Sequence, residues 1–236
     1  LVEKHYELFT DFWNTCLELG RIPANSEFEF SDQIRRIIGS HNKAYKALLG
    51  QYSEALMREA EAKRRQDLQV YFALGLFEKR KAHTHIPDGL KRDIKAFYTS
   101  YNEALENANA ALFSVGDPAT IQEACELAFA SLKCGEMKDG HSFTFHKDFL
   151  GDLPSTLRIY IGCATQLYGD LENIQLIKAH IRSGKVSLMA YDDWNKKIPC
   201  MTERIKIKMR QQDVDFFDYE GSFQPVPLEN KKIFKH

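Results

Sequence analysis

The sequence lacks the features that mark several common classes of protein. Its cysteines are odd in number and far apart, with no C-x-x-C pair: Cys16, Cys125, Cys134, Cys163 and Cys200. This arrangement argues against a disulfide framework or a zinc ribbon and favours reduced thiols, so we expect a cytoplasmic protein. No run of about 18 apolar residues and no basic-then-apolar leader occurs, so neither a membrane span nor a signal peptide is indicated.

An excess of charge of either sign is also missing. Lys and Arg number 32 against 33 Asp and Glu, so attraction to a nucleic acid would have to come from local clustering of charge. The 236 residues are 44% hydrophobic and 12% aromatic, which is enough for a packed core. The chain begins with Leu1 and not with Met, which suggests a piece of a longer protein.

Motifs for catalysis and cofactor binding are absent too. The chain has no G-x-G-x-x-G, G-K-[ST], H-E-x-x-H or G-x-S-x-G sequence. Four histidines could form a metal site in principle, but no acidic or cysteine partner stands at a ligand spacing: His83, His85, His141 and His146. We therefore predict no catalytic residue, no cofactor and no metal in this chain.

A weak nuclease-like arrangement occurs near the end of one predicted strand. Asp192 and Asp193 follow that strand, with Lys178 and Glu172 upstream, and such groups can hold Mg²⁺ in nucleases. Their order and spacing are poor, and an Asp-rich turn after a strand is the commoner structure.

The hydrophobic period predicts helices first and strands afterwards. Apolar residues recur at helical spacing in 6–20, 53–79, 88–101 and 156–168, and Asp117-Pro118 is a helix start. The period changes to 2 in 174–182, 186–191, 204–210 and 214–219. We expect an α+β fold with an N-terminal helical cluster and a small antiparallel β-meander packed on helices. A helical region 1–134 and a helix-plus-sheet region 135–236 would form two domains or one compact domain.

The stretch from 174 to 194 predicts a β-hairpin with a basic face. A two-residue turn at Ser183-Gly184 would pair His180 with Ser187 and Arg182 with Lys185. One face would be wholly apolar, and the other would hold Lys178, His180, Arg182, Lys185 and Ser187. Because no acid is in register with these cations, the row could follow a phosphate backbone. An ordinary solvated face is the alternative.

The strand 204–210 repeats this alternation, but acidic residues follow it. A turn at Gln211-Gln212 would place Asp213 opposite Arg210 and Asp215 opposite Lys208, so a self-neutralised face is the favoured interpretation there. The candidate nucleic-acid residues of both strands are Lys178, His180, Arg182, Lys185, Lys206 and Lys208. Two helical clusters could add to them, although solvated helix surfaces are the commoner role: Lys63, Arg64 and Arg65, and Lys79, Arg80 and Lys81.

Several long segments, in order, resemble one family. They are FWNTCLELGRIP (12–23), RRQDLQVYFALGLFEKR (64–80), IPDGLKRDIKAFYTSYNEALENANAALFSVGDP (86–118), LRIYIGCATQLYGD (157–170) and LIKAHIRSGKVSLMAYDDW (176–194). Together they look like the C-terminal region of the bacterial DNA phosphorothioation-associated methyltransferases. The likeness covers nearly the whole chain.

This resemblance implies that a catalytic domain that binds S-adenosylmethionine precedes the chain in its parent protein. No catalytic residue of the family is assigned to this region, so none is carried over. We expect a non-catalytic accessory domain that helps the parent engage DNA, with DNA and the upstream methyltransferase domain as partners and no membrane contact. The alternative is a protein-interaction or scaffolding module of a DNA modification or defence system without nucleic-acid contact.

Overall fold

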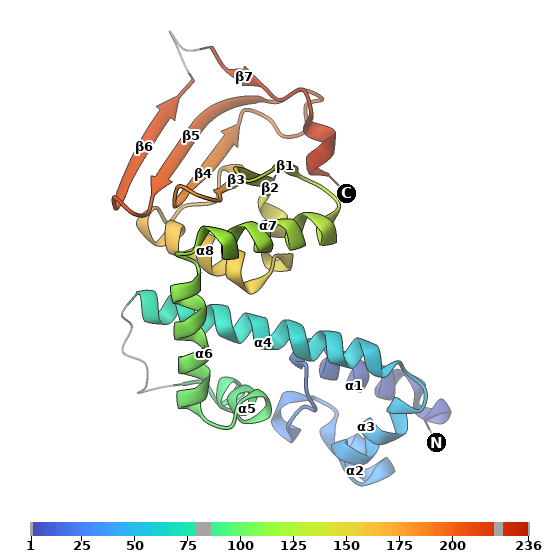
Figure 1. The fold of residues 1–236 in the computed structure, drawn as a ribbon. Helices are drawn as coiled ribbons and strands as arrows, with labels where there is room; N and C mark the ends of the chain where they lie inside the picture. Colours follow the sequence, from blue (N-terminus) through green and yellow to red (C-terminus); the bar gives the residue numbers. More distant parts are fainter. Residues whose placement is uncertain (1, 79–85, 220–223, 236) are drawn as a thin grey trace. The chain divides into compact units, whose positions relative to one another are not determined.

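The computed structural model describes residues 2–78, 86–219 and 224–235 and has an α+β fold (Figure 1). The described residues form two compact units: one within 1–68 and 85–104, and one within 69–84 and 105–236. The first unit is helical, whereas the second contains the sheet. The expected boundary after residue 134 falls inside the second unit.

The first unit is built from short helices around an aromatic core. They are α1 (Tyr6–Leu19), α2 (Ser31–Ile38), α3 (His41–Leu49), the first part of α4 (Glu54–Phe77) and α5 (Asp88–Phe97). The amphipathic pattern buries Phe9, Phe12 and Trp13 of α1 against Ile34 and Leu48. Short single-turn helices, η1 (Glu3–His5) and η2 (Asn25–Glu27), complete the unit.

A buried carboxylate joins three segments of the first unit. Asp93 is fully buried, and its two oxygens accept from Arg21 Nε at 2.7 Å and Arg64 Nη2 at 2.6 Å. Arg21 also forms a bidentate pair with Glu27, at 2.7 and 2.8 Å. Each buried charge therefore has a partner, as burial requires.

The second unit is a sequential antiparallel sheet. Its strands are β1 (Glu136–Lys138), β2 (Ser142–His146), β3 (Ile174–His180), β4 (Lys185–Tyr191), β5 (Cys200–Lys208), β6 (Asp213–Asp218) and β7 (Val226–Pro227). The order β1-β2-β3-β4-β5-β6 follows the chain, and β7 pairs with β5. The expected meander is therefore confirmed.

Helices α7 (Pro118–Leu132) and α8 (Ser155–Leu167) cover one face of this sheet (Figure 1). Ile121 and Leu157 of the helices share a core with Ile177, Leu188 and Ile205 of the strands, all nearly inaccessible. The start of α7 is as predicted, because the Asp117 carboxylate accepts from the amides of the first turn at 3.2 and 3.3 Å. The other elements of the unit are α6 (Tyr101–Ser114), shared with the first unit, and two short 3₁₀ helices, η3 (Lys147–Asp152) and η4 (Lys231–Phe234).

Two segments differ from the sequence prediction. The expected helix 88–101 ends at Phe97, because Tyr98 is extended (φ −132°, ψ 155°), and α6 then begins with Ser100 Oγ accepting from Glu103 N at 3.1 Å. The segment 135–151, in which the sequence analysis predicts no strand, contains the β1–β2 hairpin. Its strands are short, with three residues in β1 and five in β2, so the alternation of Ser142, Phe143, Thr144, Phe145 and His146 is too brief to stand out in the sequence.

Both predicted hairpin registers are wrong by two residues. The first loop is 181–184, so His180 pairs with Lys185, and the second is 209–212, so Lys208 pairs with Asp213. A two-residue type I′ turn needs a positive φ at both of its central residues. Among the described residues of each loop, only the last residue has a positive φ: Gly184 (61°) in the first loop and Gln212 (51°) in the second. Because the shift is even, the predicted faces of the strands are preserved.

Candidate nucleic-acid interface

The sheet face opposite the helices carries the predicted cations. The pairing register aligns its side chains in rows that run across the strands. The first row holds Ser142, His180, Lys185, Lys208 and Asp213; the second holds Thr144, Lys178, Ser187, Lys206 and Asp215; the third holds His146, Leu176, Met189, Arg204 and Phe217.

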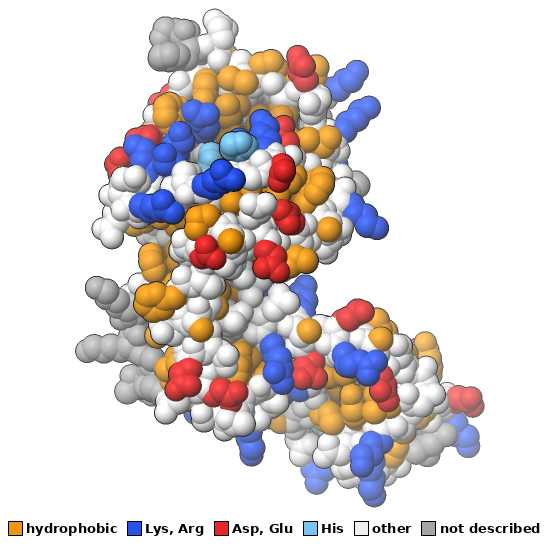
Figure 2. Space-filling view, viewed as in Figure 1, with side chains coloured by type: hydrophobic (Ala, Val, Ile, Leu, Met, Phe, Trp, Pro, Cys, Tyr) orange, Lys and Arg blue, Asp and Glu red, His pale blue; other side chains and the backbone are white. Residues whose placement is uncertain are grey.

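Three lysines dominate the first two rows. Lys178 and Lys206 lie on either side of β4, about 10 Å apart at two strand spacings, and Lys185 stands in the neighbouring row. Among the described residues, no carboxylate lies within 4 Å of the ammonium group of any of the three. Lys and Arg side chains gather beside histidines over the sheet in Figure 2. These three lysines, with His180, are called the basic patch below.

The positive charge of the basic patch affects the pKa of His180. Burial and the neighbouring cations Lys178, Lys206, Lys185 and Arg204 lower the pKa of His180 to about 4. The ring is therefore neutral at pH 7, and its Nε2 lies 3.0 Å from Ser187 Oγ. Burial and nearby cations also lower the pKa of Lys178. A bound anion would relieve this repulsion.

Lys208 differs from the other candidate lysines because acids neutralise it. Its Nζ contacts Asp215 Oδ1 at 2.7 Å and Asp213 Oδ2 at 3.1 Å, and the hydrogen bonds to these carboxylates raise the pKa of Lys208. The predicted ion pair with Asp215 forms, whereas Asp213 pairs with Lys208 and not with Arg210. Lys208 is therefore a poor phosphate ligand.

Arg182 lies in the β3–β4 loop and not in the predicted strand ladder. Its side chain is exposed, and its Nη2 is 3.3 Å from the position that a Cβ on Gly140 would occupy, beside the β1–β2 loop. It extends the cations of the first row beyond the edge of the strands.

Arg204 is a cation of this face that the sequence analysis left out of the site. Its guanidinium lies over the Phe217 ring, 4.7 Å from the centroid, and its buried Nε has no hydrogen-bond partner among the described residues. Its position in the alternating pattern of β5, on the same face as Lys206 and Lys208, is the sequence feature that could have identified it as part of the site. Stacking on Phe217 holds this charge at the rim of the basic patch.

The remainder of the face is apolar and covered. Leu176, Met189 and Met201 pack against Phe234 of η4, near the C-terminus. Lys231 of η4 is buried, and its Nζ donates to the backbone carbonyls of Trp194 and Lys196. The C-terminal segment therefore closes this end of the sheet, and the basic patch is the part left accessible.

The other candidate residues are not assembled into a site. Asp192 stabilises its own turn, because its Oδ1 accepts from Cys200 N at 2.9 Å and its Oδ2 pairs with Lys196 at 2.7 Å. No cluster of three or more potential metal ligands occurs within the described ranges. His83 and His85 lie outside these ranges, as does the cluster Lys79, Arg80 and Lys81.

The helical cluster 63–65 is engaged within its own unit. Arg64 binds Asp93, and Arg65 pairs with Glu61 at 3.3 Å. Lys63 has an interaction as well. This helix surface therefore offers little charge for a polyanion.

The buried thiols are unsuited to nucleophilic chemistry. Burial raises the pKa of Cys16 and Cys125 to about 12 and that of Cys163 to about 11, so these groups stay protonated at neutral pH. All five cysteines are free. Of the helices in the described part of the chain, none combines the length and the apolar character needed to cross a membrane.

Comparison with known proteins adds no assignment. No protein-family model matches the chain, and searches of curated proteins and of solved structures gave no match.

Proposed function

We propose that the basic patch binds the phosphate backbone of DNA. The observation that carries the proposal is the row arrangement of Lys178, Lys185 and Lys206 on a partly accessible sheet face, with no carboxylate within 4 Å of their ammonium groups in the described chain. Arg182 extends the patch at the loop. Each phosphate that these cations neutralise would release a condensed counterion, and this release is the main source of non-specific affinity.

Contact with phosphates is favoured over contact with bases. The first two rows contain Ser, Thr, His, Lys and Asp, with no Phe, Tyr or Trp on which a base could stack. The Ser and Thr side chains, Ser142, Thr144 and Ser187, are buried between the longer cations. A lysine ammonium group that contacts a phosphate does not distinguish one base from another, so binding would be insensitive to the DNA sequence.

The family resemblance gives this contact a context. In that context the chain is a non-catalytic accessory domain of a cytoplasmic DNA phosphorothioation-associated methyltransferase. S-adenosylmethionine would bind to the upstream catalytic domain of the parent protein, and the present chain would help that domain to engage DNA.

A titration of the 236-residue chain against fluorescently labelled duplex DNA tests the proposal. Anisotropy would be followed at several salt concentrations, with ordinary and with phosphorothioate linkages. We expect salt-sensitive binding of similar strength to both duplexes, because sulfur substitution keeps the phosphate charge. The variant Lys178→Glu with Arg182→Glu should bind more weakly. Absence of binding at low salt, or binding unchanged in this variant, would remove the proposal.

The alternative is a protein-interaction module. It is favoured by the near-zero net charge and by an exposed aromatic side chain, Phe113, which is 76% accessible. Such a module would bind its partner through apolar area, with little dependence on salt, and would leave duplex DNA free in the titration.

A further inference from the structure

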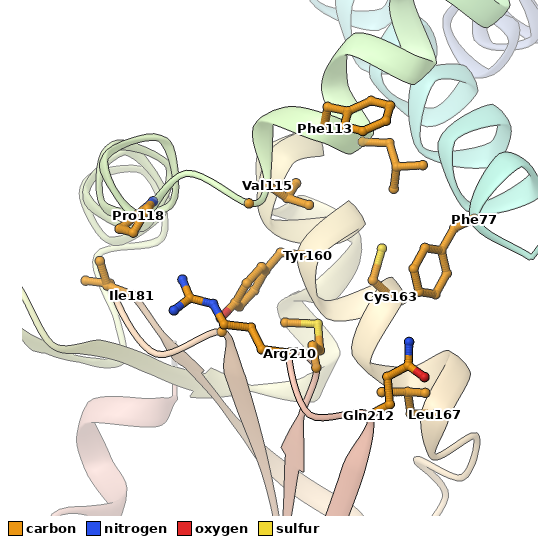
Figure 3. Close-up of a pocket in the computed structure, with 14 residues that line it drawn as sticks. Phe77, Phe113, Val115, Pro118, Tyr160, Cys163, Leu167, Ile181, Arg210 and Gln212 are labelled. Carbon is orange, nitrogen blue, oxygen red and sulfur yellow. The ribbon is translucent and has the colours of Figure 1, made fainter.

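An apolar pocket lies in the second unit, apart from the basic patch. Its volume is about 480 Å³, within the range of small-molecule sites. Figure 3 shows Phe77, Phe113, Tyr160, Cys163 and Leu167 around it, from α4, α6 and α8. The loops 181–184 and 209–212 and the segment that joins α6 to α7, with Val115, Gly116 and Pro118, supply the remaining wall.

The lining favours the apolar part of a ligand. Large apolar side chains stand partly exposed at the pocket, with 76% of Phe113, 41% of Phe77 and 38% of Leu167 accessible. Covering such area is favourable by about 25 cal/mol for each Å². The Tyr160 hydroxyl already donates to His180 O at 2.7 Å, so it is committed to the fold.

Two polar side chains of the lining remain available, Arg210 and Gln212 (Figure 3). In the described chain, no carboxylate lies within ion-pair distance of Arg210, because the nearby acids Asp213 and Asp215 bind Lys208. Among the described residues that line the pocket, Arg210 is the one charged group. Its Nε lies 3.0 Å from the position that a Cβ on Gly184 would take, so the side chain crosses the loop where only glycine leaves room.

This combination selects a class of ligand. An apolar wall with one unpaired guanidinium suits an aliphatic molecule that ends in a carboxylate, which Arg can bind with two parallel hydrogen bonds. A nucleobase suits it poorly, because a base has several polar edge atoms and the lining offers one uncommitted amide, that of Gln212. We propose that this pocket binds a medium-chain aliphatic carboxylate, with its chain between Phe77, Phe113 and Leu167 and its carboxylate on Arg210.

Isothermal titration calorimetry with decanoate tests the proposal on the 236-residue chain. Decanol is the neutral probe of the same length, and adenosine monophosphate is the nucleotide probe. We expect decanoate to bind on the order of tenfold more tightly than decanol, from one charge-assisted contact. Tighter binding of adenosine monophosphate than of decanoate, or no binding of decanoate, would overturn the proposal.

Two variants locate the binding. Arg210→Gln should weaken decanoate about tenfold and leave decanol unchanged, whereas Arg36→Gln, an exposed arginine of α2 in the other unit, should change neither. Leu167→Trp should fill the pocket and weaken both probes, with folding verified by thermal unfolding. Decanoate affinity that is equal in wild type, Arg210→Gln and Leu167→Trp would place the ligand elsewhere and refute the assignment.

Discussion

Replacement of Lys178 and Lys206 by Gln should lower the salt dependence of DNA binding by a calculable amount. The basic patch and its loop extension supply four cations that have no carboxylate at ion-pair distance in the described chain: Lys178, Arg182, Lys185 and Lys206. If each neutralises one phosphate, the slope of log K against log salt is about −3.6, and affinity falls about 150-fold between 50 and 200 mM salt. The double variant retains two cations, so its slope should be about −1.8 and its loss about 12-fold.

The assay is fluorescence anisotropy with a labelled duplex at four or more salt concentrations. Lys43→Gln with Lys46→Gln is the matched control, because both lysines are exposed on α3 in the first unit and the net charge changes equally. This control should keep the wild-type slope. Equal slopes in the wild type and the double variant would show that the basic patch does not contact phosphates, whereas a reduced slope in both variants would show that only net charge matters.

Three further predictions concern titration and stability. The pKa of His180 should be about 4 in the free chain and should rise when duplex DNA binds, as measured by side-chain NMR; an unchanged pKa on DNA binding would argue against a phosphate beside the ring. Between about pH 6.5 and 4 the unfolded state, in which the histidine pKa is near 6.5, binds more protons than the folded state. The second unit should therefore lose stability as the pH falls from about 6.5 to 4. Asp93→Ala should destabilise the first unit by about 3–5 kcal/mol in urea unfolding, since it leaves Arg21 and Arg64 without their shared carboxylate; a loss below 1 kcal/mol would contradict this. Gly20→Ala should cost about 1–3 kcal/mol in the same assay, because Gly20 has φ +63° and a Cβ there would lie 2.8 Å from a backbone carbonyl oxygen of α4; wild-type stability would refute the steric argument.

The sequence predicts the fold class and the faces of the strands, because alternation fixes which side chains share a face. It predicts neither hairpin register, because a two-residue loop and a four-residue loop place the same side chains on each face of the sheet. The two loop lengths differ in their backbone geometry at Gly184 and Gln212, which the pattern of side chains does not specify. That shift has consequences for the site: it pairs Lys208 with Asp213 and leaves Arg210 beside the pocket.

Other parts of the candidate site depend on contacts between distant residues. Closure of the apolar end of the sheet by Phe234 and Lys231 has no local pattern in the sequence. The pocket is likewise formed by helices and loops far apart along the chain. The hydrophobic period gives each element its buried face but does not specify which elements meet around a cavity.

The most direct test of the central claim is amide chemical-shift mapping of the 236-residue chain with a short DNA duplex at low salt. We predict shifts concentrated on β3, β4 and β5 around Lys178, Lys185 and Lys206, which return to their free values as salt is raised. Absence of shifts on these strands, or shifts confined to the first unit, would contradict the assignment of the basic patch as the DNA-binding surface.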